Sequence, residues 1–147
     1  MHIESVQLKN FRNYQDLQLG FDKGTNIFYG DNAQGKTNIL ESVYICGTTK
    51  SHKGSKDKDL IRFGKEESHI RMLIKKDGLS YKIDMHLRKN KAKGVAINGL
   101  SIKKASELFD EDVYAAIDLD ACVARRMSEG GTAPEQVTAQ IASAREQ

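Results

Sequence analysis

Alternating hydrophobic and polar residues predict strands in the first part of the chain. The alternation is regular over residues 16–21 and less regular over 3–11. A short apolar run at 24–30 contains the β-branched and aromatic residues that are typical of a buried strand. We therefore expect three strands before residue 31.

A β-hairpin is predicted beyond the middle of the chain. Residues 68–76 and 79–88 each place their large apolar side chains on one face, and Asp77-Gly78 between them is typical of a tight hairpin turn. A further strand, an Asn98-Gly99 turn and the start of a helix are expected within 94–109. With the earlier strands, these segments predict a β-rich lobe over residues 1–30 and 68–102.

One helix is predicted between the two groups of strands. Residues 36–46 place Ile39, Leu40 and Val43 at a helical spacing, which favours one buried face, and Cys46 fits that helix as a small buried residue. Residues 47–59 are polar, basic and interrupted by glycine, so we expect an exposed loop there.

The segment between the apolar run at 24–30 and this helix matches the pattern G-x-x-x-x-G-K-T. Two glycines permit a turn whose backbone N–H groups face inward, and the following helix adds its unpaired amides and the positive end of its dipole. Lys36 would reach the β- and γ-phosphates of a nucleotide, and the Thr37 hydroxyl would take one place on Mg²⁺. The alternative is a chance glycine turn, which the strand–loop–helix context disfavours. The candidate phosphate-binding residues are Gly30, Asp31, Asn32, Ala33, Gln34, Gly35, Lys36 and Thr37.

Composition divides the chain into two parts. The net charge of the 147 residues is +3, but residues 1–110 carry +7 and residues 111–147 carry −4 with no lysine. We therefore expect one domain at 1–109 and a tail of different origin at 110–147. Cys46 and Cys122 are isolated, and four scattered histidines suggest neither a disulfide framework nor a zinc site. No apolar stretch approaches the length of a membrane span and no leader is evident, so we expect a soluble, cytoplasmic protein without a membrane partner.

Residues 1–109 resemble the amino-terminal segment of the RecF family of DNA replication and repair proteins. The resemblance rests on "LKNFRNY" (8–14), "GDNAQGKTNILE" (30–41) and "TTKSHKG" (48–54) at the family's mutual spacings. It implies a mixed α/β (α+β) fold, a truncated P-loop ATPase head similar to the ABC and SMC group. Such heads bind ATP and Mg²⁺ between two subunits as ATP-dependent homodimers. They hold DNA at gaps and stalled forks, together with the other recombination mediators of the RecF pathway.

The same resemblance assigns a nucleotide contact to Arg12 and Asn13, which end the first predicted strand. An alternative for Arg12 is a solvated charge at the edge of the sheet.

Two basic stretches are candidates for contacts to DNA phosphates. The hairpin stretch consists of Arg88, Lys89, Lys91 and Lys93, and the loop stretch consists of Lys50, Lys53, Lys56 and Lys58. Such side chains position duplex DNA without reading its sequence. Alternatively, they only keep the surface soluble. Neither stretch contains the interleaved aromatic residues that stack on single strands.

The RecF pattern is interrupted after residue 109. Complete heads add a signature segment and a strand that ends in adjacent carboxylates, whereas Asp118 and Asp120 lie in an amphipathic, helical stretch. No catalytic residue is therefore assigned, and we expect ATP binding without hydrolysis. The tail is expected to form two helices and resembles the carboxy-terminal end of argininosuccinate lyase through "VYAAIDLDACV" and "GGTAPEQV". No lyase site is carried over, and a chimera could arise by recombination, engineering or an assembly error.

Three functions remain open on the sequence. The leading one is an ATP-binding, DNA-binding protein of replication and recombinational repair with an incomplete head. The second is a nucleotide-binding fragment or chimera without a function. The third is a remnant related to argininosuccinate lyase.

Overall fold

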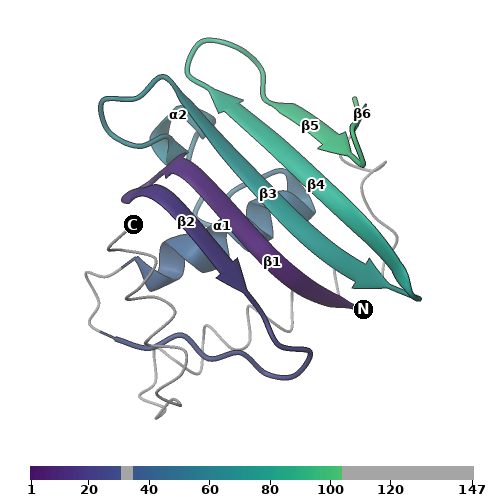
Figure 1. Ribbon diagram of the computed structural model, residues 1–147. Helices are drawn as coiled ribbons and strands as arrows, with labels where there is room; N and C mark the ends of the chain where they lie inside the picture. Colours follow the sequence, from purple (N-terminus) through teal and green to yellow (C-terminus); the bar gives the residue numbers. More distant parts are fainter. Residues whose placement is uncertain (31–34, 104–147) are drawn as a thin grey trace.

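A six-stranded antiparallel sheet with one helix against its inner face forms the body of the molecule (Figure 1). This computed structural model describes residues 1–30 and 35–103. The strands lie in the order β2-β1-β3-β4-β5-β6. The elements are β1 (His2–Phe11), β2 (Tyr14–Gly20), α1 (Lys36–Thr48), α2 (Asp57–Leu60), β3 (Glu67–Lys76), β4 (Leu79–Arg88), β5 (Gly94–Ile97) and β6 (Leu100–Ser101).

Strand register places the apolar side chains of the four longest strands on the face that α1 covers. Leu8 of β1 pairs with Leu17 of β2 and with Ile70 of β3, and Ile70 in turn pairs with Met85 of β4. All four are buried and belong to one core cluster with side chains of α1. The helix side chains in that cluster are Ile39, Val43, Ile45 and Cys46. The predicted burial of Cys46 and of the hairpin's apolar face is therefore confirmed.

An irregularity in β1 explains why residues 3–11 alternate imperfectly in the sequence. Ile3 pairs with Ile74, but Ser5 pairs with Leu73, so the register shifts between the two pairs. An extra residue at such a bulge moves the following side chains to the opposite face. Ile3, an odd-numbered residue, can therefore pack against the same core as Val6.

Both predicted turns are confirmed. Asp77 and Gly78 have φ of 51° and 77°, and Asn98 and Gly99 have φ of 49° and 83°. Positive φ at both central residues matches the twist of the flanking strands in a two-residue hairpin. The register from Lys76↔Leu79 through Glu67↔Arg88 follows directly from the first turn.

The predicted third strand, residues 24–30, is not a strand in this structure. Among the described residues the sheet consists of β1 to β6, with β2 and β6 at its edges. A strand needs a neighbour to satisfy its backbone groups, and residues 25–29 have no such place in this sheet. Phe28 is nevertheless buried, with its ring edge-to-face against Phe21 at 5.9 Å. The apolar run therefore indicates side-chain burial, as at Phe28, and does not indicate strand pairing.

The predicted exposed loop at 47–59 is partly helical. α1 continues to Thr48, and α2 occupies Asp57–Leu60. The α2 turn forms because the Asp59 carboxylate accepts a hydrogen bond from the Lys56 N–H at 3.3 Å, while Leu60 is buried. Neither helix of the described part has the length and apolar character that crossing a membrane requires. The predicted helix start beyond the last turn, and the tail with Asp118, Asp120 and Cys122, lie outside the described residues.

Candidate nucleotide-binding site

The two glycines of the phosphate-loop pattern adopt the backbone geometry that the pattern requires. Gly30 has φ of 141° and Gly35 has φ of 83°, and α1 begins directly after Gly35. Residues 31–34 (Asp31, Asn32, Ala33 and Gln34) lie outside the described residues. The Lys36 ammonium donates a hydrogen bond to the Gly30 carbonyl oxygen, so its side chain lies across the mouth of the loop. The described ends of the loop are thus arranged as a phosphate-binding turn.

Gly35 is the point at which the loop meets the sheet. A Cβ atom there would lie 2.6 Å from Asn13 Nδ2 and 2.8 Å from the Tyr14 hydroxyl, so these side chains would have to move to admit one. The Asn13 side-chain oxygen also accepts a hydrogen bond from Asn38 Nδ2 at 2.9 Å. Asn13 therefore lies beside the start of α1, and the turn between β1 and β2 fixes where the helix begins.

The start of α1 is suited to an anion. The first amides of any helix lack acceptors within the helix, and its dipole places positive charge at this end. The first turn of α1 carries no acidic side chain, so no carboxylate of that turn opposes an approaching phosphate. Thr37 is exposed here, which leaves its hydroxyl accessible to solvent and ions.

Arg12 forms an ion pair with α1 and is not a solvated charge at the sheet edge. Its Nε and Nη2 atoms donate to the two carboxylate oxygens of Glu41, each at 3.0 Å. The guanidinium also donates to Ser55 Oγ at 2.8 Å and to the Asp59 carbonyl at 3.1 Å. Only 24% of the Arg12 side chain is exposed. The fork of donors is thus engaged within the protein, and a nucleotide contact by Arg12 stays a prediction.

Glu41 is the site residue that the sequence reasoning missed. It is fully buried on α1, and it also accepts a hydrogen bond from Ser51 Oγ at 2.6 Å and lies 3.9 Å from the Lys53 ammonium. One feature of the sequence could have indicated it: a glutamate lies among the apolar residues of the predicted helix. A buried glutamate needs a charged partner.

The pKa of Glu41 reflects the same contacts. Burial alone would raise this pKa, but the hydrogen bonds from Arg12 and Ser51 and the charges of Arg12 and Lys53 outweigh burial and leave the pKa below its ordinary value. The carboxylate is therefore ionised at neutral pH and holds the loop after α1 in place.

The two basic stretches adjoin, and part of their charge is neutralised. Lys89 lies 3.1 Å from a Glu66 carboxylate oxygen, and Lys93 lies 3.0 Å from Asp57. The Lys93 ammonium also donates to the Thr49 carbonyl, which ties the hairpin stretch to the loop stretch. The other members are placed as follows: Arg88 donates to the Ala92 carbonyl, Lys53 approaches Glu41, and Lys50, Lys56, Lys58 and Lys91 are exposed.

Known proteins are similar to this chain in sequence and in fold. Residues 5–123 match the family model described as an AAA domain. The chain belongs to the AAA domain family. Over 109 residues it is 69% identical to the DNA replication and repair protein RecF of Agathobacter rectalis, a match that covers 74% of this chain and 30% of that protein. The chain thus spans about 30% of the length of the RecF relatives it matches.

Solved structures agree with this assignment of the AAA domain. The recombination mediator protein RecF-ATP of the RecFOR pathway has a TM-score of 0.69 at 33% identity, over 74% of this chain and 30% of that one. The SMC head bound to the C-winged helix domain of ScpA has a TM-score of 0.66 at 22% identity, over 80% of this chain and 41% of that one, which shows a shared fold. The predictions of a RecF-type head segment and of a truncated SMC-like α/β head are confirmed.

The buried Glu41 ion pair of this AAA domain predicts a specific loss of stability. Removing one partner of a buried pair leaves the other charge unpaired, so we expect Glu41→Gln to lower the free energy of unfolding by up to about 3 kcal/mol. Glu66→Gln is the matched control, because Glu66 is 73% exposed in its pair with Lys89 and such surface pairs contribute about 0–1 kcal/mol. Urea denaturation of both variants measures the difference.

Acid should remove the same contribution from the unsubstituted protein. A carboxylate with a lowered folded-state pKa stabilises the fold above its unfolded pKa, and this stabilisation is lost as the pH falls through the folded pKa. For Glu41 that window lies below the ordinary value of 4.5. Equal unfolding free energies for Glu41→Gln and Glu66→Gln at neutral pH would contradict the account.

Proposed function

We propose that this chain is the ATP-binding part of a RecF-type head that acts in DNA replication and recombinational repair in the cytoplasm. The carrying observation is the arrangement of Gly30, Gly35 and Lys36 at the start of α1, where positive φ angles, a lysine and helix amides converge. A RecF–ATP structure that is similar over 74% of this chain supports ATP as the ligand. Residues 31–34 would supply further backbone donors.

Mg²⁺ is proposed to accompany the nucleotide. Thr37 offers an exposed hydroxyl one residue after the phosphate-binding lysine, which fits a cation that takes oxygen ligands and retains several waters. The ion would neutralise charge on the β- and γ-phosphates when bound. Glu41 is buried and engaged by Arg12, so α1 contributes the Thr37 hydroxyl and not this carboxylate.

The proposed activity is binding without turnover. Hydrolysis requires a positioned water and a closed site in addition to charge neutralisation. Lys36, Thr37 and the helix amides supply only charge neutralisation. In the RecF family the remaining groups belong to segments downstream of this head segment and to an opposing subunit. Two copies of this chain that paired as the complete RecF proteins do are therefore not expected to hydrolyse ATP.

DNA at single-strand/double-strand gaps and the recombination mediators of the RecF pathway are the proposed partners. The adjoining basic stretches support contacts to the phosphate backbone. Because Lys89 and Lys93 already have acidic partners, DNA must displace Glu66 and Asp57 to use them. Lys91 is exposed and becomes the stronger candidate within the hairpin stretch.

A boundary near residue 110 is proposed on the change of composition and on the lyase-like tail. The curated relatives align over 109 residues, which supports this boundary. The AAA domain match continues to residue 123, which favours a longer head segment. Limited proteolysis with mass spectrometry distinguishes a cut near residue 110 from a resistant fragment that extends past 123.

Nucleotide binding should depend on Lys36. We expect calorimetry to detect Mg-ATP binding by the unsubstituted chain and no binding by Lys36→Ala, because the ammonium supplies the mobile positive charge of the loop. Lys65→Ala is the matched control, since Lys65 is exposed in the turn before β3, and it should bind normally. Equal affinity of Lys36→Ala and Lys65→Ala would refute the phosphate-loop assignment. Phosphate release above the Lys36→Ala level would refute binding without turnover.

DNA binding should weaken steeply with salt. Each phosphate that a lysine or arginine neutralises adds about 0.9 to the slope of log affinity against log salt for B-form DNA, so we expect Lys91→Ala to reduce the slope by about this amount. Lys23→Ala, at an exposed position outside both basic stretches, is the control. Fluorescence anisotropy with duplex DNA over a salt series measures both. If neutralising Arg88, Lys89, Lys91 and Lys93 together leaves the slope unchanged, the hairpin stretch does not bind DNA.

A further inference from the structure

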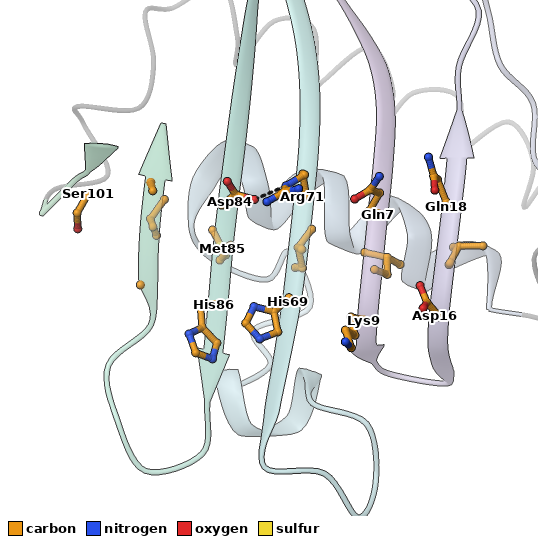
Figure 2. A pocket seen from close by; sticks show the side chains of 16 residues that line it. Gln7, Lys9, Asp16, Gln18, His69, Arg71, Asp84, Met85, His86 and Ser101 are labelled. Carbon is orange, nitrogen blue, oxygen red and sulfur yellow. Dashed lines mark hydrogen bonds and ion pairs between the residues drawn. The ribbon is translucent and has the colours of Figure 1, made fainter. Parts of the chain in front are cut away.

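The outer face of the sheet, opposite α1, contains an open cavity that the nucleotide site does not use. The cavity has a volume of about 610 Å³ and is lined by side chains from β1 to β6 (Figure 2). Figure 2 shows His69 of β3 and His86 of β4 side by side within it, while α1 lies behind the sheet. His69 is exposed in this cavity, and His86 beside it is half-buried.

Strand register brings together the two histidines, which are 17 residues apart in the sequence. His69 and His86 are directly paired across the β3–β4 ladder. Their rings are stacked with centroids 4.1 Å apart and an angle of 19° between planes.

Glu67 adds a carboxylate to the histidine pair. It precedes His69 by two residues on the same face of β3, and its Oε2 atom lies 3.2 Å from His86 Nε2. The possible ligand atoms of Glu67, His69 and His86 all lie within 4.8 Å of one another. His86 Nε2 has no solvent contact and no aligned hydrogen-bond partner among the described residues. This nitrogen therefore has an unused lone pair or proton directed toward the cluster.

We propose that Glu67, His69 and His86 form a binding site for a divalent transition-metal ion of the Zn²⁺ class. Two imidazole nitrogens and one carboxylate are a common ligand set for Zn²⁺, with a fourth position left to water. Tetrahedral ligands at about 2.0–2.1 Å from zinc lie about 3.4 Å apart. Rotation of exposed side chains is enough to reach that spacing, and the strand backbones need not move. The ligand set disfavours Mg²⁺, which prefers oxygen ligands.

The charges around the cluster permit a cation. Arg71 and Asp84, on the same face, pair with each other at 2.6 Å, so together they add little net charge. Lys9 pairs with His69 across the β1–β3 ladder and opposes a cation, but its side chain is exposed and can turn into solvent.

Zinc binding by the full chain tests this proposal. We expect metal-free protein to bind added Zn²⁺ at one site, measured by competition with a chromogenic chelator. His69→Gln and His86→Gln should each lower the affinity by more than about 100-fold, because loss of an outer-shell partner alone costs about 10–100-fold. His2→Gln and His52→Gln are matched controls at the other two histidines and should bind as the unsubstituted chain does. Loss of binding in a control, or unchanged affinity in both ligand variants, would overturn the proposal.

Two further measurements separate this site from the nucleotide site and from misfolding. Thr37→Ala should bind Zn²⁺ with unchanged affinity, and excess Mg²⁺ should not displace the zinc. Glu67→Gln is a conservative ligand variant on an exposed position, and it should weaken binding while its circular dichroism spectrum stays unchanged. Displacement by Mg²⁺, or loss of binding in Thr37→Ala, would place the ion at the phosphate loop and refute the site.

Discussion

The ion pair between Arg12 and Glu41 determines how the phosphate loop is presented. A fully buried carboxylate on α1 must have a compensating charge, and Arg12 supplies it from the turn between β1 and β2. Arg12 adopts a φ of 50° at this turn, a backbone conformation that costs free energy for a residue with a side chain. The same turn places Asn13 against Gly35. One electrostatic contact therefore sets the position of the helix and the loop relative to the sheet.

The same ion pair also holds the basic loop that follows α1. Ser51 and Lys53 join the same carboxylate, and Ser55 joins the same guanidinium. The sequence shows only that this loop is polar and basic. In the structure, three of its side chains contact the Arg12–Glu41 ion pair.

Local patterns predicted much of the sheet and the phosphate loop. The Asp77-Gly78 turn fixes the register of β3 and β4, and the pattern from Gly30 to Thr37 specifies a turn and a helix start. Long-range contacts could not be predicted in the same way. The pairing of His69 with His86 depends on hairpin register, and the partner of Glu41 depends on a turn 29 residues earlier. The strand prediction at 24–30 is wrong because apolar character records burial, whereas strand pairing also needs a neighbouring strand.

Amide hydrogen exchange of α1 with and without Mg-ATP tests the central claim, that phosphate binds at the start of this helix, most directly. The account predicts slower exchange at Lys36, Thr37 and Asn38 when nucleotide is present, because their amides lie at the phosphate-binding end of the helix. Exchange within the β3–β4 hairpin should stay the same. Saturating nucleotide that leaves the three α1 amides unchanged, or that protects the hairpin instead, would contradict the account.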